Sequence, residues 1–134
     1  DWSSDVCSSD LGRDHREDPN RPNSSCWTTP DVKNAADAPL VFDCRCSIYF
    51  GTVDGPPPGP DASPSRCYSS YVCMDRHTGG INTVFMDWSV RKVGLKRLWA
   101  LKWHKEYDTA GRWTPAGGVQ PADWPDWMRR FKDP

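Results

Sequence analysis

Apolar and polar residues are interleaved from residue 81 to residue 93, on both sides of the dipeptide Asp87-Trp88. Two runs of strand-forming residues around a two-residue turn predict an antiparallel hairpin. Counting outward from the turn pairs Phe85 with Val90. In this register one face carries Ile81, Phe85 and Val90, and the other carries Val84, Met86 and Val93. Because both faces are apolar, we expect other parts of the chain to cover both of them.

After the hairpin, the spacing of apolar residues changes to that of a helix. The positions i, i+3, i+4 and i+8 are filled by Leu95, Leu98, Trp99 and Trp103. This stripe predicts an amphipathic helix over about residues 95 to 107, with its apolar side packed against the hairpin.

A second helical stripe lies over residues 123 to 131. It consists of Trp124, Trp127, Met128 and Phe131. Asp123 is placed to cap the first turn, where Pro125 is also tolerated, so we expect a short C-terminal helix. Four tryptophans of the two stripes are candidates for the core or for contacts with a partner, and their spacing favours the core: Trp99, Trp103, Trp124 and Trp127.

The first half of the chain has more turn signals than periodic elements. Strand formers from Leu40 to Phe50 predict one or two buried strands. The run from Gly55 to Pro60 lacks sheet donors at its prolines and predicts a surface loop. A proline-rich ligand for an aromatic groove is the alternative reading of that loop. Together these patterns predict a small, loop-rich α+β fold.

Residues 1 to 11 show neither strand alternation nor a helical stripe. Their sequence, Asp-Trp-Ser-Ser-Asp-Val-Cys-Ser-Ser-Asp-Leu, resembles the conceptual translation of a sequencing-library adapter. Such a segment is set aside before a fold is inferred, although an ordinary unstructured N-terminus is the alternative. We therefore expect residues 1 to 11 to be disordered and residues 12 to 134 to form one domain, whose natural N-terminus is missing.

Composition supports a single domain and weakens two classes of partner. The chain has 134 residues, with 13 Pro and 10 Gly and a net charge of -1. The balanced charge gives no argument for nucleic acid or for an anionic membrane. Six cations without an acid lie between Arg91 and Lys105, and we expect them to stay in water or to pair with acids elsewhere.

The six cysteines leave three interpretations open: a zinc site, disulfide bonds or free thiols. Cys44, Cys46, Cys67 and Cys73, with His77 and His104, are suitable zinc ligands in type. Their spacings differ from the pairs separated by two to four residues that structural zinc sites favour. Disulfide bonds, most plausibly between Cys67 and Cys73, are the favoured interpretation, and we expect neither a metal nor a cofactor.

Nothing in the sequence indicates an enzyme. The chain has 3 His and lacks a nucleophile elbow, a zinc-protease motif and a phosphate-binding loop. His77 precedes a strand of six residues and Asp87 follows it, which separates them by roughly 20 Å. We expect Asp87 to accept backbone hydrogen bonds in the turn, and His77 to order the loop before the strand.

The segment from His77 to Asp87, with nine residues between them, resembles the prepilin-type processing-associated H-X9-DG domain of pseudopilin-like type II secretion proteins. The strings from Trp88 to His104, from Gly117 to Pro121 and from Asp123 to Met128 are similar to one subgroup of that family. The resemblance implies a pilin-like head without enzymatic activity, with motif positions His77, Gly79, Gly80 and Asp87. Trp88 stands where the family has Gly, so the turn type is in question.

The resemblance also implies where the protein acts. The head is expected outside the cytoplasm, on a parent protein anchored in the inner membrane by an N-terminal helix that these residues lack. Its partners would be other pilin-like subunits or the secretion machinery, with no nucleic acid. Two other functions stay open: a secreted aromatic-rich glycan-binding module and, with less support, a zinc-dependent nucleic-acid binder.

Overall fold

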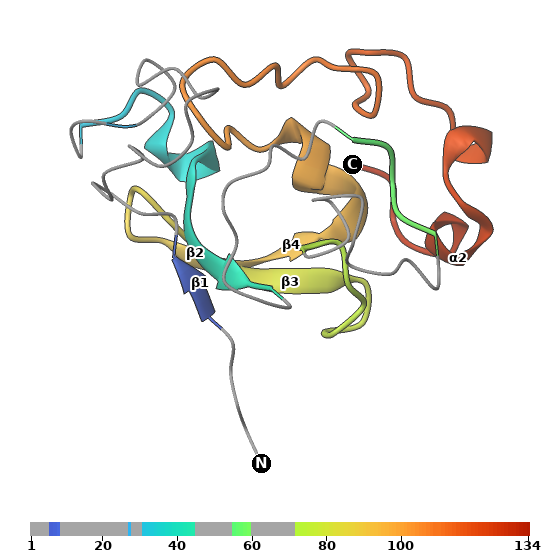
Figure 1. Cartoon of the computed structure of the whole chain (residues 1–134), viewed down its shortest axis with the longest axis horizontal. Helices are drawn as coiled ribbons and strands as arrows, with labels where there is room; N and C mark the ends of the chain where they lie inside the picture. Colours follow the sequence, from blue (N-terminus) through green and yellow to red (C-terminus); the bar gives the residue numbers. More distant parts are fainter. Residues whose placement is uncertain (1–5, 9–26, 28–30, 45–54, 60–71) are drawn as a thin grey trace, which may run out of the picture.

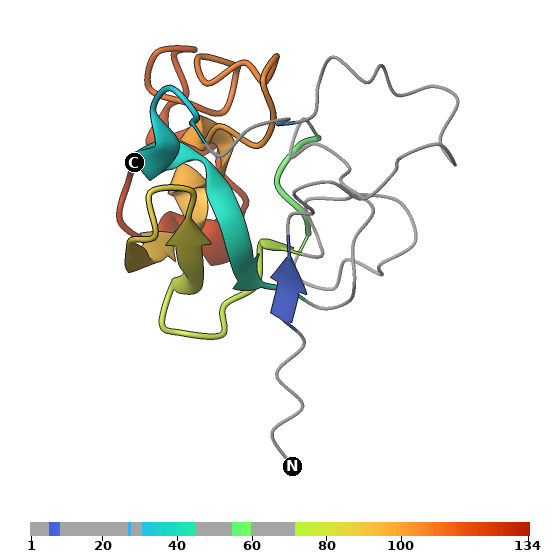
Figure 2. The same ribbon diagram turned by 90° about the vertical axis from the view of Figure 1, so that its left-hand side faces the viewer.

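The computed structural model describes residues 6–8, 27, 31–44, 55–59 and 72–134. Four antiparallel strands form one sheet in the order β1-β2-β3-β4. They are β1 (Val6–Ser8), β2 (Pro39–Asp43), β3 (Gly80–Phe85) and β4 (Val90–Gly94). Figure 2 shows the sheet with β1 and β4 at its two edges.

Strand β1 lies inside the segment that we expect to be foreign and disordered. Its three residues pair with β2, Val6 opposite Asp43 and Ser8 opposite Val41. The expectation of disorder is therefore wrong for residues 6 to 8, while the other residues of that segment are outside the described ones. Strand β2 confirms the first of the strands predicted from Leu40 to Phe50. Residues 45 to 50, where a second strand would lie, are outside the described residues.

The hairpin of β3 and β4 forms, but its predicted register is wrong by one residue. Val84 pairs with Val90, and Ile81 pairs with Val93. The loop has three residues, because the N–H of Phe85 donates to the carbonyl of Ser89 at 2.9 Å and the N–H of Trp88 donates to that of Phe85 at 2.9 Å.

The one-residue shift exchanges the faces of β4. Val93 therefore joins Ile81 and Phe85 in the core, whereas Val90 is 71% exposed on the other face. The expectation that both faces are covered is accordingly wrong at the tip of the hairpin.

The helices among the described residues are short: η2 (Ala35–Asp37), η3 (Leu95–Ala100), η4 (Pro121–Asp123) and α2 (Asp126–Arg129). None of the described helices is long and apolar enough to span a membrane. Figure 1 shows the segment after β4, orange to red, running over one side of the sheet. These elements make a small α+β fold.

The helix predicted over residues 95 to 107 ends at Ala100, as a 3-10 helix. In an α-helix the Leu98 carbonyl would accept the N–H of Lys102. Here the Lys102 N–H donates to the carbonyl of Asp37 at 2.8 Å, and the indole N–H of Trp103 donates to Leu98 at 2.7 Å. A tertiary partner, Asp37, and a local one, the Trp103 indole, therefore take the backbone groups that would have continued the helix.

The predicted C-terminal helix divides into η4 and α2, with Trp124 extended between them. The carboxylate of Asp123 accepts the backbone N–H of Gln120 at 2.8 Å, so it caps η4 rather than α2. Pro125 is the N-cap residue before α2, which begins at Asp126.

The core confirms the two apolar stripes. Leu95, Leu98, Trp99 and Trp103 are all buried, as are Trp124 and Met128. Trp127 and Phe131 are partly buried against the same cluster. A smaller cluster beside the hairpin contains Val32, Ala38, Leu40 and Met86.

Candidate functional site

His77 and Asp87 lie at opposite ends of β3 and have different partners. His77 Nε2 is 2.9 Å from Asp43 Oδ2, which also accepts the backbone N–H of Asn82 at 2.9 Å. His77 thus ties the loop before β3 to the end of β2. This contact gives the histidine a positioning role in the sheet.

Asp87 stabilises the turn. Its carboxylate accepts the Ser89 hydroxyl at 2.6 Å and the Ser89 backbone N–H at 2.9 Å. These hydrogen bonds, with a smaller contribution from the charge of Arg91, lower the pKa of Asp87 below its ordinary value. Asp87 therefore accepts a backbone hydrogen bond in the turn, as its place in the sequence predicts.

Gly79 and Gly80 allow close approach of two other segments. Gly79 has φ +79, and a Cβ there would lie 2.6 Å from the ring of Phe131. A Cβ on Gly80 would lie 2.7 Å from the carbonyl oxygen of Val93. Asp75 accepts the Gly79 N–H at 2.5 Å and also binds Arg130 at 2.8 Å. Gly79 therefore allows the C-terminal segment to approach the hairpin, and Gly80 allows β3 and β4 to approach each other.

Trp88 combines backbone strain with exposure. Its φ is 66, the left-handed conformation that the last residue of this three-residue turn requires. A bulky residue adopts that conformation at a cost that Gly avoids. Trp88 is 74% exposed and Val90 is 71% exposed, and they are the exposed large apolar side chains of the described residues.

Trp99, Trp113 and Trp124 form an aromatic cluster. The ring centroids of Trp99 and Trp124 are 5.4 Å apart, and those of Trp113 and Trp124 are 5.6 Å apart. Trp103 makes an edge contact with Phe42 at 5.1 Å. These contacts assign Trp99, Trp103 and Trp124 mainly to the core, as their spacing predicts.

The proline-rich segment binds this aromatic cluster. The indole N–H of Trp99 donates to the carbonyl of Gly55 at 3.0 Å, and that of Trp127 donates to Pro58 at 2.9 Å. Polyproline II has three residues per turn, so carbonyls three residues apart lie on the same side of the segment. Pro58 is buried, and the prediction of a simple surface loop is wrong for it.

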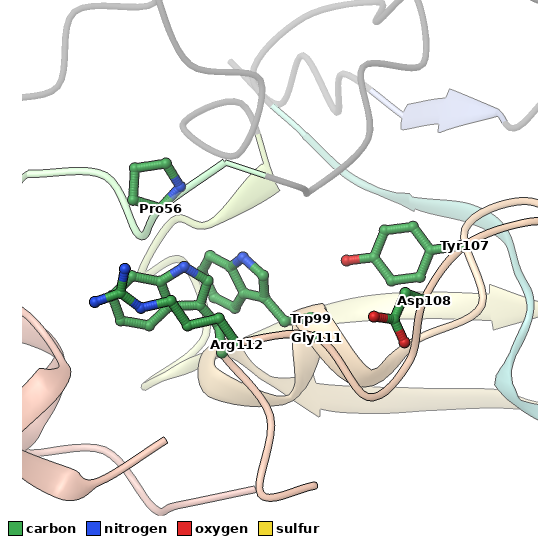
Figure 3. A pocket seen from close by; sticks show the side chains of 7 residues that line it. Pro56, Trp99, Tyr107, Asp108, Gly111 and Arg112 are labelled. Atoms are coloured by element: carbon green, nitrogen blue, oxygen red, sulfur yellow. The ribbon is translucent and has the colours of Figure 1, made fainter. Parts of the chain in front are cut away.

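A cavity of about 420 Å³ opens beside this segment. Its walls are Pro56, Trp99, Tyr107, Asp108, Gly111, Arg112 and Trp113. Figure 3 shows the hydroxyl end of Tyr107 directed toward Trp99, with Pro56 on a separate segment. The guanidinium of Arg112 lies 5.3 Å from the centre of the Trp113 ring. Aromatic walls with a few polar groups are typical of small-ligand sites.

Sequence reasoning did not find this cavity. Tyr107 is the end of the predicted helix, and Trp113 stands alone among turn residues without a period. Their convergence depends on the end of η3 at Ala100 and on the irregular chain that follows. The signal that was available is the number of aromatic and polar residues between positions 103 and 113.

The cations between residues 91 and 105 are largely partnered. Arg91 bonds the carbonyl of Ala36 and lies 3.3 Å from Asp37 Oδ1. Lys96 is only 1% exposed, and its Nζ is 2.7 Å from Asp133 Oδ1 and 2.8 Å from the Phe131 carbonyl. The expectation that cations of this stretch pair with acids is confirmed for Arg91 and Lys96. The expectation that Lys96 stays in water is wrong, because its side chain is buried.

The cysteines correct the predicted pairing. Cys73 is a buried thiol that approaches the sulfur of Met128 at 3.9 Å, so a bond from Cys73 to Cys67 is wrong. Cys44 is disulfide-bonded. Cys46 and Cys67 lie outside the described residues. Oxidation of Cys44 removes one thiolate from the zinc alternative, and the described residues contain no group of three suitable ligands.

No family model, curated protein or solved structure matches this chain.

Proposed function

We propose that the chain is a pilin-like head, a structural subunit of a type II secretion or type IV pilus-like assembly that acts through protein–protein contacts. The observation that carries the proposal is the tip of the hairpin. Trp88 and Val90 are both exposed there, two positions apart in sequence, and Trp88 is held in a strained conformation. Exposed apolar residues that are maintained despite strain are typical of contact surfaces.

The H-X9-D positions support the same proposal. His77 binds Asp43 at the end of β2, and Asp87 binds Ser89 within the turn. Gly79 allows the close approach of the C-terminal segment, and Gly80 allows that of β4. His77 and Asp87 bind different groups, at opposite ends of β3. These contacts give the motif positions a structural role in the hairpin. The disulfide at Cys44 agrees with a location outside the cytoplasm, where such bonds persist.

Co-expression with the pilin-like subunits of the source genome tests the proposal. We expect at least one of those subunits to co-purify with the chain, and we expect less of it after Val90→Ser. Lys33→Ala changes an exposed residue outside the hairpin and serves as the matched control. Failure of every pilin-like subunit to co-purify would contradict the proposal.

The cavity favours a second candidate, a glycan-binding module. Asp108 and Arg112 are exposed polar residues beside the aromatic walls, an arrangement able to hydrogen-bond sugar hydroxyls. Binding to a glycan array should then be lost in Asp108→Asn and Arg112→Ala and retained in Lys33→Ala. Absence of binding across the array would exclude this candidate.

A further inference from the structure

Strand β4 presents one free side of its backbone to the outside of the sheet. The hydrogen bond from Phe85 to Ser89 fixes which groups of β4 face β3. Partners alternate along an antiparallel pair, so Arg91 and Val93 bond toward β3, while Val90, Lys92 and Gly94 direct their N–H and carbonyl groups away from it. No backbone bond between described residues reaches these outward groups of Val90 and Lys92.

The exposed apolar side chains stand at the start of this edge. Val90 is the first residue of β4, and Trp88 precedes it by two positions. Tryptophan is enriched among the residues that dominate binding energy at protein interfaces. An edge strand with apolar side chains is a template for the addition of another strand.

The charge along the edge indicates the kind of strand that fits. Arg91 and Arg97 share one acidic partner, Asp37, and Lys92 bonds the carbonyl of Thr78. The three cations Arg91, Lys92 and Arg97 therefore outnumber the two acids near this edge, Asp37 and Asp87. A second copy of β4 would bring its own Arg91 and Lys92 beside the same cations, and like charges opposite each other destabilise a strand pair.

We propose that the outward edge of β4 is a docking site for an extended, acidic segment of another protein. That segment adds a strand next to β4, with an apolar side chain against Trp88 and Val90 and acidic side chains near Lys92 and Arg97. This inference deepens the proposed function, since it names the face and the chemistry of the partner.

The probe is a fluorescent peptide of about eight residues that alternates valine with glutamate, and its control alternates valine with lysine. We expect the acidic peptide to bind and to perturb the amide resonances of Val90 and Lys92 in preference to those of Arg91 and Val93. The lysine peptide should bind at least about tenfold more weakly.

Two variants separate binding from folding. Trp88→Gly suits the φ of 66 and should leave the fold intact, while it weakens peptide binding by at least about tenfold. Lys92→Pro removes one outward N–H without loss of a bond to β3 and should abolish binding. Lys92→Ala keeps that N–H and is the matched control, so it should weaken binding far less than Lys92→Pro.

Equal binding of the two peptides, no binding of the acidic peptide, or full binding by a folded Lys92→Pro variant would overturn this inference. If a pilin-like subunit co-purifies and Lys92→Pro does not affect it, the docking site is wrong and the proposed function stands. If the acidic peptide docks on β4 and no pilin-like subunit associates, the proposed function is wrong and the docking site stands.

Discussion

At the scale of single residues, Lys96 shows how a cation can be part of a core. Its ammonium group has two oxygen partners, from Phe131 and Asp133, and lies 5.6 Å from the centre of the Trp124 ring. The sequence places Lys96 next to a buried leucine in a basic stretch, which favours an exposed position. Its partners lie more than thirty residues away, so the pattern around Lys96 could not predict them.

Lys96→Ala should lower the free energy of unfolding by about 1 to 3 kcal/mol, because the Phe131 carbonyl loses its charged donor and the packed side-chain stem is removed. Lys33→Ala, at an exposed lysine, should change it by less than about 0.5 kcal/mol. Urea denaturation of both variants measures the difference. Equal effects would contradict a structural role for Lys96.

The lowered pKa of Asp87 predicts that the stability of the protein depends on pH in the acidic range. Its pKa in the folded protein is lowered from the ordinary value of 3.8, mainly by the hydrogen bond from the Ser89 side chain. A depressed folded-state pKa contributes stability above 3.8, and this contribution is lost as the pH falls from 3.8 through the lower folded-state value. Wild type should therefore lose more stability than Asp87→Asn over that acidic range. Parallel pH profiles from thermal unfolding would contradict the prediction.

At the scale of elements, the existence of the hairpin was predictable and its register was not. Apolar runs on either side of Asp87-Trp88 mark two strands. The loop length depends on whether Trp88 accepts a positive φ, which sequence preference argues against for a tryptophan. One residue of error at the turn then moves Val90 from the predicted core to the surface.

The apolar stripe after the hairpin predicts burial better than helix length. Leu95, Leu98, Trp99 and Trp103 are buried even though the helix ends at Ala100. The spacing of Leu95, Leu98 and Trp99 fixes the side of the helix that faces the core. The helix does not continue, because the backbone N–H of Lys102 donates to Asp37 in a tertiary contact and the indole of Trp103 donates to the Leu98 carbonyl.

Two substitutions at Trp99 separate packing from hydrogen bonding. Trp99→Ala should cost about 3 to 5 kcal/mol, because the side chain is 3% exposed and its removal leaves a cavity beside Trp124. Trp99→Phe keeps much of the ring and loses the bond to Gly55, so its cost should be smaller and include about 1 kcal/mol for that bond. Chemical denaturation compares the two, and equal losses would show that packing at this site contributes little.

At the scale of the whole molecule, long-range partners decide what local patterns leave open. The α+β class and most core residues follow from periodicity in the sequence. Other features depend on segments that meet across the fold. They are the thiol state of Cys73, the cavity beside Trp99 and the packing position of the proline-rich segment. Pro58 and Trp127 are 69 positions apart, and their contact joins two segments that show no relation in sequence.

One edge of the sheet is β1, whose residues lie in the segment that resembles a translated adapter. Strand β1 contributes three residues at the border of β2, away from the hairpin. Most of the sheet contacts lie between β2, β3 and β4, and a short terminal edge strand adds little to a cooperative core. Deletion of residues 1 to 11 should therefore lower the free energy of unfolding by less than about 1 kcal/mol in urea titrations. A larger loss would show that Val6–Ser8 is an integral strand of the domain, and would count against an origin of that segment outside the gene.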